Sequence, residues 1–293
     1  NAHFFARSEQ ECFDQIKRLF AFLPANYRER SEPLAVKEPK RQYKIESVIP
    51  KDSKEPFDVR DVIRALVDDS EFMEVYELFA PNAVIGFARV NGETVGIIGN
   101  QALYLAGVLD IDASDKIARF ILFCNAFNIP LLTLMDIPGY LPGSDQEHAG
   151  VIRHGAKVLY AYSEATVPKV TVITRKAYGG AYIAMCCKDL GADAVFAWPG
   201  AEIAVLGADG AVAITGRREL AKAKAEGRDV AAVHKELSDA YTRENVNPYL
   251  SVARGELDAI ITPEDTRSTI VSALRVLRMP AVASKNFLIT IGD

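Results

Sequence analysis

Apolar residues recur at helical spacing near the start of the chain and then give way to a stretch without a regular pattern. Residues 9–23 predict an amphipathic helix. Its apolar face consists of Phe13, Ile16, Leu19 and Phe20. Residues 24–56 contain five of the fourteen prolines and many charges. This composition is typical of a linker or extended arm, and equally of an ordered strap packed on a neighbouring unit.

The regular pattern resumes near residue 56 with a helix, a hairpin and a second helix. Residues 57–75 predict one helix with Asp58 as its N-cap. Two apolar runs flank Asn91-Gly92, a pair that suits a two-residue type I′ turn, so this segment predicts a β-hairpin. Residues 110–130 predict another capped helix.

Continuous apolar strands then alternate with helices. Residues 130–136, 168–175 and 193–199 are such strands, and the first two lead through glycine-rich loops into helices. Residues 145–166 predict one of these helices, and residues 202–207 predict a further short strand. Strands buried on both faces that alternate with helices indicate an α/β fold with a parallel sheet and right-handed crossovers.

The last ninety residues are predominantly helical in pattern. Residues 217–244 are charged and amphipathic, and a later helix is expected with Thr262 as N-cap, Pro263 at its first position and Asp265 at its third. The apolar face of that helix consists of Ile270, Val271, Leu274 and Leu277. This face is expected to cover either the sheet or a partner in an oligomer.

Composition narrows the function classes. The formal net charge of −5 and the absence of a clustered basic face argue against nucleic-acid binding. No apolar run is long enough to cross a bilayer, and the first twenty residues carry charges throughout, so we expect neither membrane insertion nor a signal peptide. The four cysteines form no C-x-x-C pair, which indicates reduced core thiols in a cytoplasmic protein without a metal site. They are Cys12, Cys124, Cys186 and Cys187.

The candidate chemistry lies in the loops that follow the first two strands. In open α/β folds, ligands gather at the carboxyl ends of parallel strands. The loop at Gly179-Gly180-Ala181 opens a helix there, so its backbone N–H groups lack intrahelical partners. We interpret the N–H groups of Gly180 and Ala181 as an oxyanion hole. Two alternatives stay open: glycines needed only for close helix–strand packing, and a phosphate cradle, although no phosphate-loop motif is present.

Other polar groups are weaker candidates. Ser144, Asp145, His148 and His154 are close in sequence, but no G-x-S-x-G elbow accompanies them, and helix-surface polarity explains them better. Asp136 ends a strand beside the loop, where it could orient that loop. Arg153 and Lys157 lie four residues apart on one helix face, which suits either an anion site or a solvated face. Trp198 with Pro199 indicates a packing corner.

Several long motifs occur in the order found in one enzyme family. These are residues 86–101 (GFARVNGETVGIIGNQ), 106–132, 136–211 (from DIPGYLPGSDQEHAG through RKAYGGAY to VLGADGA) and 247–267. Over about residues 45–280 the chain resembles the C-terminal domain of biotin-dependent acyl-CoA carboxyltransferases. The family includes the β subunits of propionyl-CoA and acetyl-CoA carboxylases, the transcarboxylase large subunit and the α subunits of methylmalonyl-CoA decarboxylases.

The resemblance implies a crotonase-like ββα superhelix (the ClpP/crotonase fold) and a carboxyl transfer between biotin and the α-carbon of a short-chain acyl-CoA, propionyl/methylmalonyl or acetyl/malonyl. It implies that Gly180 and Ala181 form the oxyanion hole that serves biotin. The remaining implied site residues shape the turn and its neighbouring loop, or contact substrate. They are Gly179 and Gly139 for the turn and loop, and Tyr140, Tyr178, Tyr182 and Ile183 for substrate.

The family pattern also implies partners. Carboxylated biotin is carried covalently on a biotin carboxyl carrier protein, charged by a biotin carboxylase subunit, and the assembly is a homo-oligomer, trimer or hexamer. Family members carry a preceding N-domain that binds the CoA ester. We therefore interpret residues 1–55 as a helix and linker from that N-domain, which is absent here, and residues 56–293 as the carboxyltransferase C-terminal domain. The isolated chain is then a half-site and inactive alone.

Three alternatives remain. The chain could be the decarboxylase α subunit of a biotin-dependent sodium pump, because Ile183 replaces the acidic residue of many propionyl-specific members. It could be a non-catalytic module that binds the biotin carrier or organises an oligomer. An enoyl-CoA hydratase relative is disfavoured, because Lys176 and Tyr178 stand where a carboxylate base is needed.

Overall fold

A computed structural model describes residues 2–39, 45–50, 52 and 55–277. Across these residues, eight strands form one sheet in the order β1-β2-β3-β4-β5-β6-β8, with β7 paired to β5. The strands are β1 (Phe72–Val75), β2 (Ala83–Val90), β3 (Glu93–Asn100), β4 (Leu131–Ile137), β5 (Lys169–Tyr178), β6 (Ala194–Ala197), β7 (Glu202–Ala204) and β8 (Ala259–Ile260). The first three pair antiparallel, and every later pairing is parallel.

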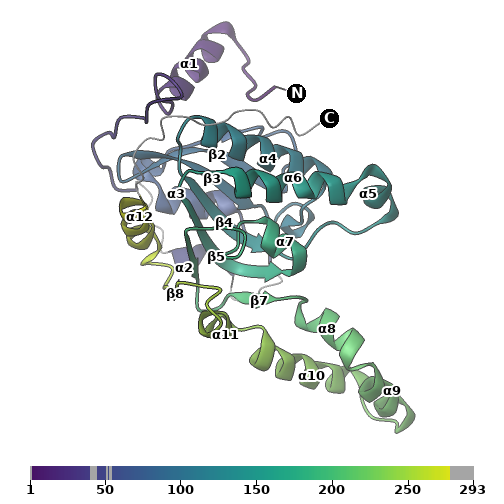
Figure 1. Cartoon of the computed structure of the whole chain (residues 1–293). Coiled ribbons are helices and arrows are strands. Elements are labelled where there is room, and N and C mark those ends of the chain that lie inside the picture. The colour runs from purple at the N-terminus through teal and green to yellow at the C-terminus, as the bar shows by residue number, and fades with distance from the viewer. Residues whose placement is uncertain (1, 40–44, 51, 53–54, 278–293) are drawn as a thin grey trace.

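Helices cover both faces of the sheet and extend beyond it (Figure 1). They are α1 (Glu9–Phe20), α2 (Ile45–Val48), α3 (Val59–Leu66), α4 (Ile111–Ala126), α5 (Ser144–Ala149), α6 (Val151–Glu164), α7 (Gly179–Ala184), α8 (Ala208–Thr215), α9 (Arg217–Ala225), α10 (Val230–Asn245), α11 (Pro248–Ala253) and α12 (Thr266–Val276). Two 3₁₀ turns are η1 (Asp68–Ser70) and η2 (Leu105–Gly107). The α8–α10 arm projects away from the sheet (Figure 1).

Alternate residues of the central strands enter two different cores. Leu131 and Met135 of β4 pack beneath α4 and α6, whereas Leu132 and Leu134 pack with α3 and α12 on the opposite face. This explains why the strands read as continuous apolar runs: both of their faces are buried. The apolar face of α12 covers the sheet, which decides between the two roles that the sequence left open.

The predicted helix over residues 57–75 is wrong in its second half. Asp58 caps α3 as expected, and its side chain accepts a hydrogen bond from Arg60 N at 2.9 Å. The helix ends at Leu66, after which Asp69 and Ser70 adopt positive φ. Residues 72–75 alternate between half-buried and buried positions as β1, because strand pairing with β2 outweighs local helical periodicity.

One buried carboxylate connects the hairpin to the C-terminal helix. The predicted turn is confirmed, and Asn91 and Gly92 both have positive φ. Asp68 accepts hydrogen bonds from both turn N–H groups, at 3.0 and 2.6 Å. Its Oδ1 also lies 2.7 Å from Arg267 Nη2 of α12. Asp68 thus holds together segments almost two hundred residues apart in sequence.

Other boundaries also differ from the sequence expectations. The helix expected over residues 145–166 is broken at Gly150 (φ +88) into α5 and α6. The helix α12 begins at Thr266 rather than after Thr262, whose hydroxyl instead accepts from Asp265 N in the preceding turn. Within the described part of residues 24–56, Leu34 N donates to Gly92 O of this chain's own hairpin at 2.9 Å, and most of residues 25–38 are exposed, so packing of this strap on a neighbouring unit stays a prediction.

A buried lysine organises the loop between β1 and β2. Lys116 of α4 is 2% exposed, and its Nζ lies within 3.2 Å of four backbone carbonyl oxygens. The acceptors belong to Tyr76, Phe79, Ala80 and Ala83. Burial lowers the pKa of the Lys116 ammonium to about 8.

Replacement of this lysine tests the loop's dependence on it. Lys116→Met leaves buried carbonyl groups without a donor, and each such group costs roughly 1–3 kcal/mol. We expect the free energy of unfolding in urea to fall by about 3 kcal/mol. The exposed Lys222→Met is the control, and its change stays within about 0.5 kcal/mol. Equal losses of free energy of unfolding in the two variants would show that the four carbonyl groups do not depend on Lys116.

The same lysine predicts a pH dependence. Its pKa falls from 10.5 in the unfolded chain to about 8 in the folded chain, so between these values the unfolded chain binds more protons. The pH-dependent part of the Lys116 contribution to the free energy of unfolding therefore rises from pH 8 towards pH 10.5 and is lost as the pH falls through 8. Urea titrations at pH 7.5 and 9.5 measure it as the difference between wild type and Lys116→Met. A difference that shrinks at the higher pH would overturn the assignment.

Candidate active site

The glycine turn follows a strand that is longer than the sequence predicts. β5 continues to Tyr178, three residues beyond the expected end, because β7 pairs with its last three residues. The helix α7 then begins at Gly179, whose φ of +58° is costly for residues with a side chain. The turn thus lies at the carboxyl end of a parallel strand, as expected.

The first turn of α7 leaves donors free for a ligand. Gly180 and Ala181 belong to the first turn of the helix, where backbone N–H groups have no acceptor within the helix. The described hydrogen bonds include none donated by either N–H group. Gly180 is exposed, whereas the side chain of Ala181 is buried in the core. Gly180 therefore lies at the surface, and the buried Ala181 next to it anchors the turn in the core.

The space around Gly179 and Gly180 shows which of the two glycines is required by packing and which leaves room for a ligand. A Cβ on Gly179 would come 3.1 Å from Val205 O, so this residue is required by its turn. A Cβ on Gly180 would meet no atom within 4 Å. Close helix–strand packing therefore does not explain Gly180, and the open space suits a group that approaches the backbone closely.

The loop after β4 lies beside this turn. β4 and β5 are neighbours, and Ile137 pairs with Ala177 after a shift in register. Gly139 (φ +152) accepts from Leu109 N at 3.1 Å, and Leu141 N donates back to Leu109 O at 2.7 Å. These bonds fix the Gly139 loop against the segment that precedes α4.

The tyrosines proposed as substrate contacts have structural neighbours. Tyr140 packs on Gly155 of α6, and burial raises its pKa to about 12. The hydroxyl of Tyr178 donates to Glu202 of β7, and burial and this bond both raise its pKa. Burial also raises the pKa of Tyr182. All three phenols are neutral at pH 7, which leaves them able to pack or donate but not to act as bases.

Ile183 differs from these tyrosines. It lies on α7, 46% exposed, on the helix that the glycine turn opens.

A buried ion pair underlies both loops, and one of its members was missed in the sequence. Asp136 and Arg175 have side chains only 3% and 6% exposed, with Asp136 Oδ2 2.7 Å from Arg175 Nη2. The other carboxylate oxygen of Asp136 accepts from Lys176 N at 3.1 Å. Arg175 also donates to Glu55 O at 2.6 Å and stacks over Phe57. Arg175 could have been found in the sequence as a charged residue within an otherwise apolar strand, which indicates a buried ion pair.

The Ser144–His154 cluster does not assemble a triad. His154 Nδ1 lies 2.9 Å from Asp115 of α4, and Lys157 Nζ lies 3.1 Å from the same carboxylate. Ser144 and His148 lie on α5, on the other side of the break at Gly150. Lys157 is therefore engaged in an ion pair, and Arg153 lies 3.0 Å from His154 Nε2.

The cysteine expectation holds in part. Cys124, Cys186 and Cys187 are buried and free, but Cys12 is exposed on α1.

Trp198 is buried, and its indole N–H donates to Thr266 at 2.9 Å, which confirms the packing corner. In the described part of the chain, three or more potential metal ligands of the His, Cys, Asp or Glu type do not gather anywhere. No described helix has both the length and the apolar character that crossing a bilayer requires.

The family model described as "Carboxyl transferase domain" matches residues 1–286. The chain belongs to the carboxyl transferase family. It is 49% identical over 287 residues to the propionyl-CoA carboxylase beta chain of Saccharopolyspora erythraea, covering 94% of this chain and 53% of that one. It is 50% identical over 278 residues to methylmalonyl-CoA decarboxylase subunit alpha of Propionigenium modestum, with the same coverage. The chain therefore spans about half the length of these relatives.

The solved structures agree. Transcarboxylase 12S, a hexamer crystallised with methylmalonyl-coenzyme A and methylmalonic acid, superposes with a TM-score of 0.87 at 48% identity. The match covers 97% of this chain and 55% of that one. The beta subunit of Pseudomonas aeruginosa geranyl-CoA carboxylase gives a TM-score of 0.71 at 27% identity, over 99% of this chain and 55% of that one. The crotonase-like fold expected from the sequence is confirmed.

The buried ion pair yields a stability prediction. Asp136→Asn or Arg175→Met leaves one buried charge without its partner, so each is expected to lower the free energy of unfolding by about 3–5 kcal/mol. The double variant Asp136→Asn/Arg175→Met should cost less than the sum of the two, because neither charge is then left alone. Urea unfolding measures all three. Glu226→Gln, in an exposed pair, is the control, and additive losses would show that the pair is not coupled.

Proposed function

We propose that this chain forms the biotin-facing half of a carboxyltransferase active site acting on a short-chain acyl-CoA. The observation that carries the proposal is the open space at Gly180 beside two unpaired N–H donors. The relatives at 48–50% identity are named for propionyl-CoA or methylmalonyl-CoA, which makes this the acyl class that we infer. Because the chain spans half of their length, the inference concerns a half-site.

The glycine turn fits the cofactor that the family uses. Biotin carries a ureido oxygen, a planar acceptor that needs close backbone approach, and the Gly180 position leaves space for one. When bound in its carboxylated form on a carrier protein, biotin supplies the carboxyl group. The chain's own contribution is electrostatic: the N–H groups of Gly180 and Ala181 stabilise negative charge that develops on an oxygen placed there. Each well-aimed donor contributes roughly 3–4 kcal/mol to such a step.

The surroundings of the turn keep these donors in place. Val205 O lies against Gly179, and β7 clamps the end of β5 from one side. The Asp136–Arg175 pair fixes the same strand end through Lys176 N. A preorganised hole of this kind needs no reorganisation when charge develops, which is the source of its catalytic effect. No protein base is required, in line with the neutral tyrosines around it.

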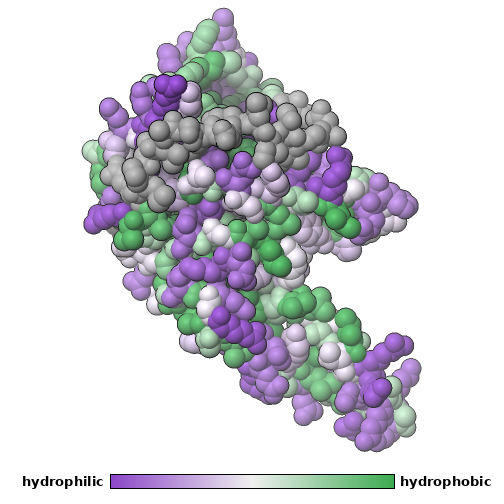
Figure 2. Space-filling model, viewed as in Figure 1, coloured by the Kyte–Doolittle hydropathy of each residue, from purple (hydrophilic) through white to green (hydrophobic). Residues whose placement is uncertain are grey.

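We also infer partners from the exposed surface. Val205, Leu206 and Ile214 are 78%, 42% and 68% exposed on and before α8. Figure 2 shows apolar side chains gathered there, between the body and the charged tip of the arm. Such a patch is typical of an interface. A second subunit, in a homo-oligomer such as the transcarboxylase hexamer, is the inferred occupant, with a biotin carboxyl carrier protein and biotin carboxylase as the functional partners.

The proposal is tested at Gly180. Gly180→Ala adds a methyl group into open space, so the fold should be unaffected, whereas an oxygen at the hole loses its close approach. In a polypeptide that includes the family's N-domain, supplied with methylmalonyl-CoA and free biotin, decarboxylation should fall about 10²-fold. Gly200→Ala, which also points into open space, is the matched control and should keep full activity.

The outcomes separate two candidate functions. Loss of turnover with an unchanged melting temperature supports the oxyanion role. Full activity of Gly180→Ala would show that the glycine turn does not act as the oxyanion hole. A folded wild-type complex without activity on any acyl-CoA would favour a non-catalytic assembly module.

A further inference from the structure

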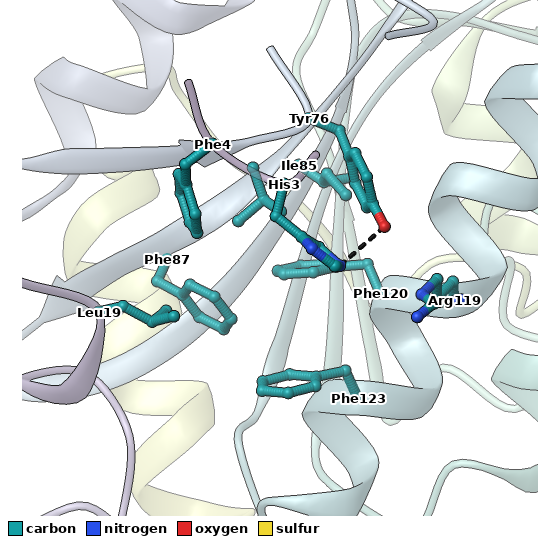
Figure 3. A pocket seen from close by; sticks show the side chains of 10 residues that line it. His3, Phe4, Leu19, Tyr76, Ile85, Phe87, Arg119, Phe120 and Phe123 are labelled. Carbon is teal, nitrogen blue, oxygen red and sulfur yellow. Dashed lines mark hydrogen bonds between the residues drawn. The ribbon is translucent and has the colours of Figure 1, made fainter. Parts of the chain in front are cut away.

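An apolar cavity of about 550 Å³ lies under the N-terminal segment, three strands away from β5. Here residues 3–4 and α1 lie over β1 and β2, and α4 closes the cavity from the side of the central strands. Side chains from five segments form its wall: residues 3–4, α1, the end of β1 with Tyr76, β2 and α4. Figure 3 shows how they surround it. The principal ones are Phe4, Leu19, Ile85, Phe87, Phe120 and Phe123. Its size is in the range of about 300–1,000 Å³ that small-molecule sites occupy.

One end of this cavity is polar. His3 Nε2 lies 2.7 Å from the Tyr76 hydroxyl, and the Arg119 guanidinium lies on the same side (Figure 3). A second cavity of about 490 Å³ shares these three residues and is otherwise lined by Phe79, Lys116 and two aspartates. His3, Tyr76 and Arg119 therefore mark the boundary between an apolar chamber and a polar one.

Arg119 is the cation available to a ligand at this boundary. Lys116 is occupied by four carbonyl groups, and the Asp115 carboxylate is engaged by His154 and Lys157. Among the described residues, none forms a hydrogen bond or ion pair with the exposed Arg119 guanidinium. Asp112 disfavours an anion deep in the polar chamber, so an anionic group is best placed at Arg119 itself.

We propose that this cavity binds a medium-chain carboxylate, with its hydrocarbon tail among the phenylalanine rings and its carboxylate on Arg119. An apolar wall with one cation at its mouth matches a molecule with one apolar end and one negative end. The guanidinium can engage both carboxylate oxygens at once. The site is separate from the glycine turn and does not rest on the proposed carboxyltransferase function.

The probe is decanoate, titrated into the chain by calorimetry, with decanol as the neutral-headed comparison. Arg119→Gln should weaken decanoate about tenfold, since a charge-assisted hydrogen bond contributes roughly 1.5 kcal/mol, and should leave decanol unchanged. Leu19→Trp fills the cavity from α1 and should weaken both ligands. Arg218→Gln, an exposed arginine on α9, is the matched control and should change neither.

Each outcome decides the proposal. Saturable decanoate binding that both cavity variants weaken supports it. Binding that Leu19→Trp leaves unchanged reflects association with another surface and overturns it. An equal loss of affinity for decanoate and decanol in Arg119→Gln would show that Arg119 does not bind the carboxylate, which overturns the proposal. No saturable decanoate binding below the concentration at which decanoate forms micelles rejects the site, provided that circular dichroism shows a folded chain.

Discussion

The Asp136–Arg175 ion pair is the constraint on which the candidate active site depends. Its two charges are withdrawn almost completely from water, so their attraction is weakly screened and neither can be removed alone without a large cost. The pair joins the ends of β4 and β5, the two strands that lead into the Gly139 loop and the glycine turn. Through Glu55 O and the ring of Phe57, Arg175 also fixes the segment before α3.

This arrangement suits catalysis by backbone dipoles. A hole made of two N–H groups has no side chain to adjust, so its geometry depends wholly on the strand and helix that carry it. β7 on one side and β4 on the other hold the end of β5, and Ala181 anchors α7 in the core. The polar side chains near the turn then serve structural roles: the Tyr140 hydroxyl donates to Gly155 O, and the Tyr178 hydroxyl donates to Glu202.

The sequence predicted elements with strong local signals and missed those that depend on distant partners. The hairpin at Asn91-Gly92 and the cap at Asp58 follow from local turn and capping chemistry, and both are present. Residues 72–75 look helical in isolation but form a strand because β2 offers them hydrogen bonds. The break at Gly150 was missed because the apolar period continues across it, although a glycine in the left-handed region ends α5.

By itself the sequence determined the α/β class, the position of the glycine turn at the end of a buried strand, and membership of the carboxyl transferase family. These depend on local periodicity and on motifs that are contiguous along the chain. Only the tertiary structure decided that Gly180 faces open space, that Arg175 pairs with Asp136, and that a cavity lies under the N-terminal segment. Each of these depends on which residues from distant segments meet, and long-range packing leaves no periodic trace in a single sequence.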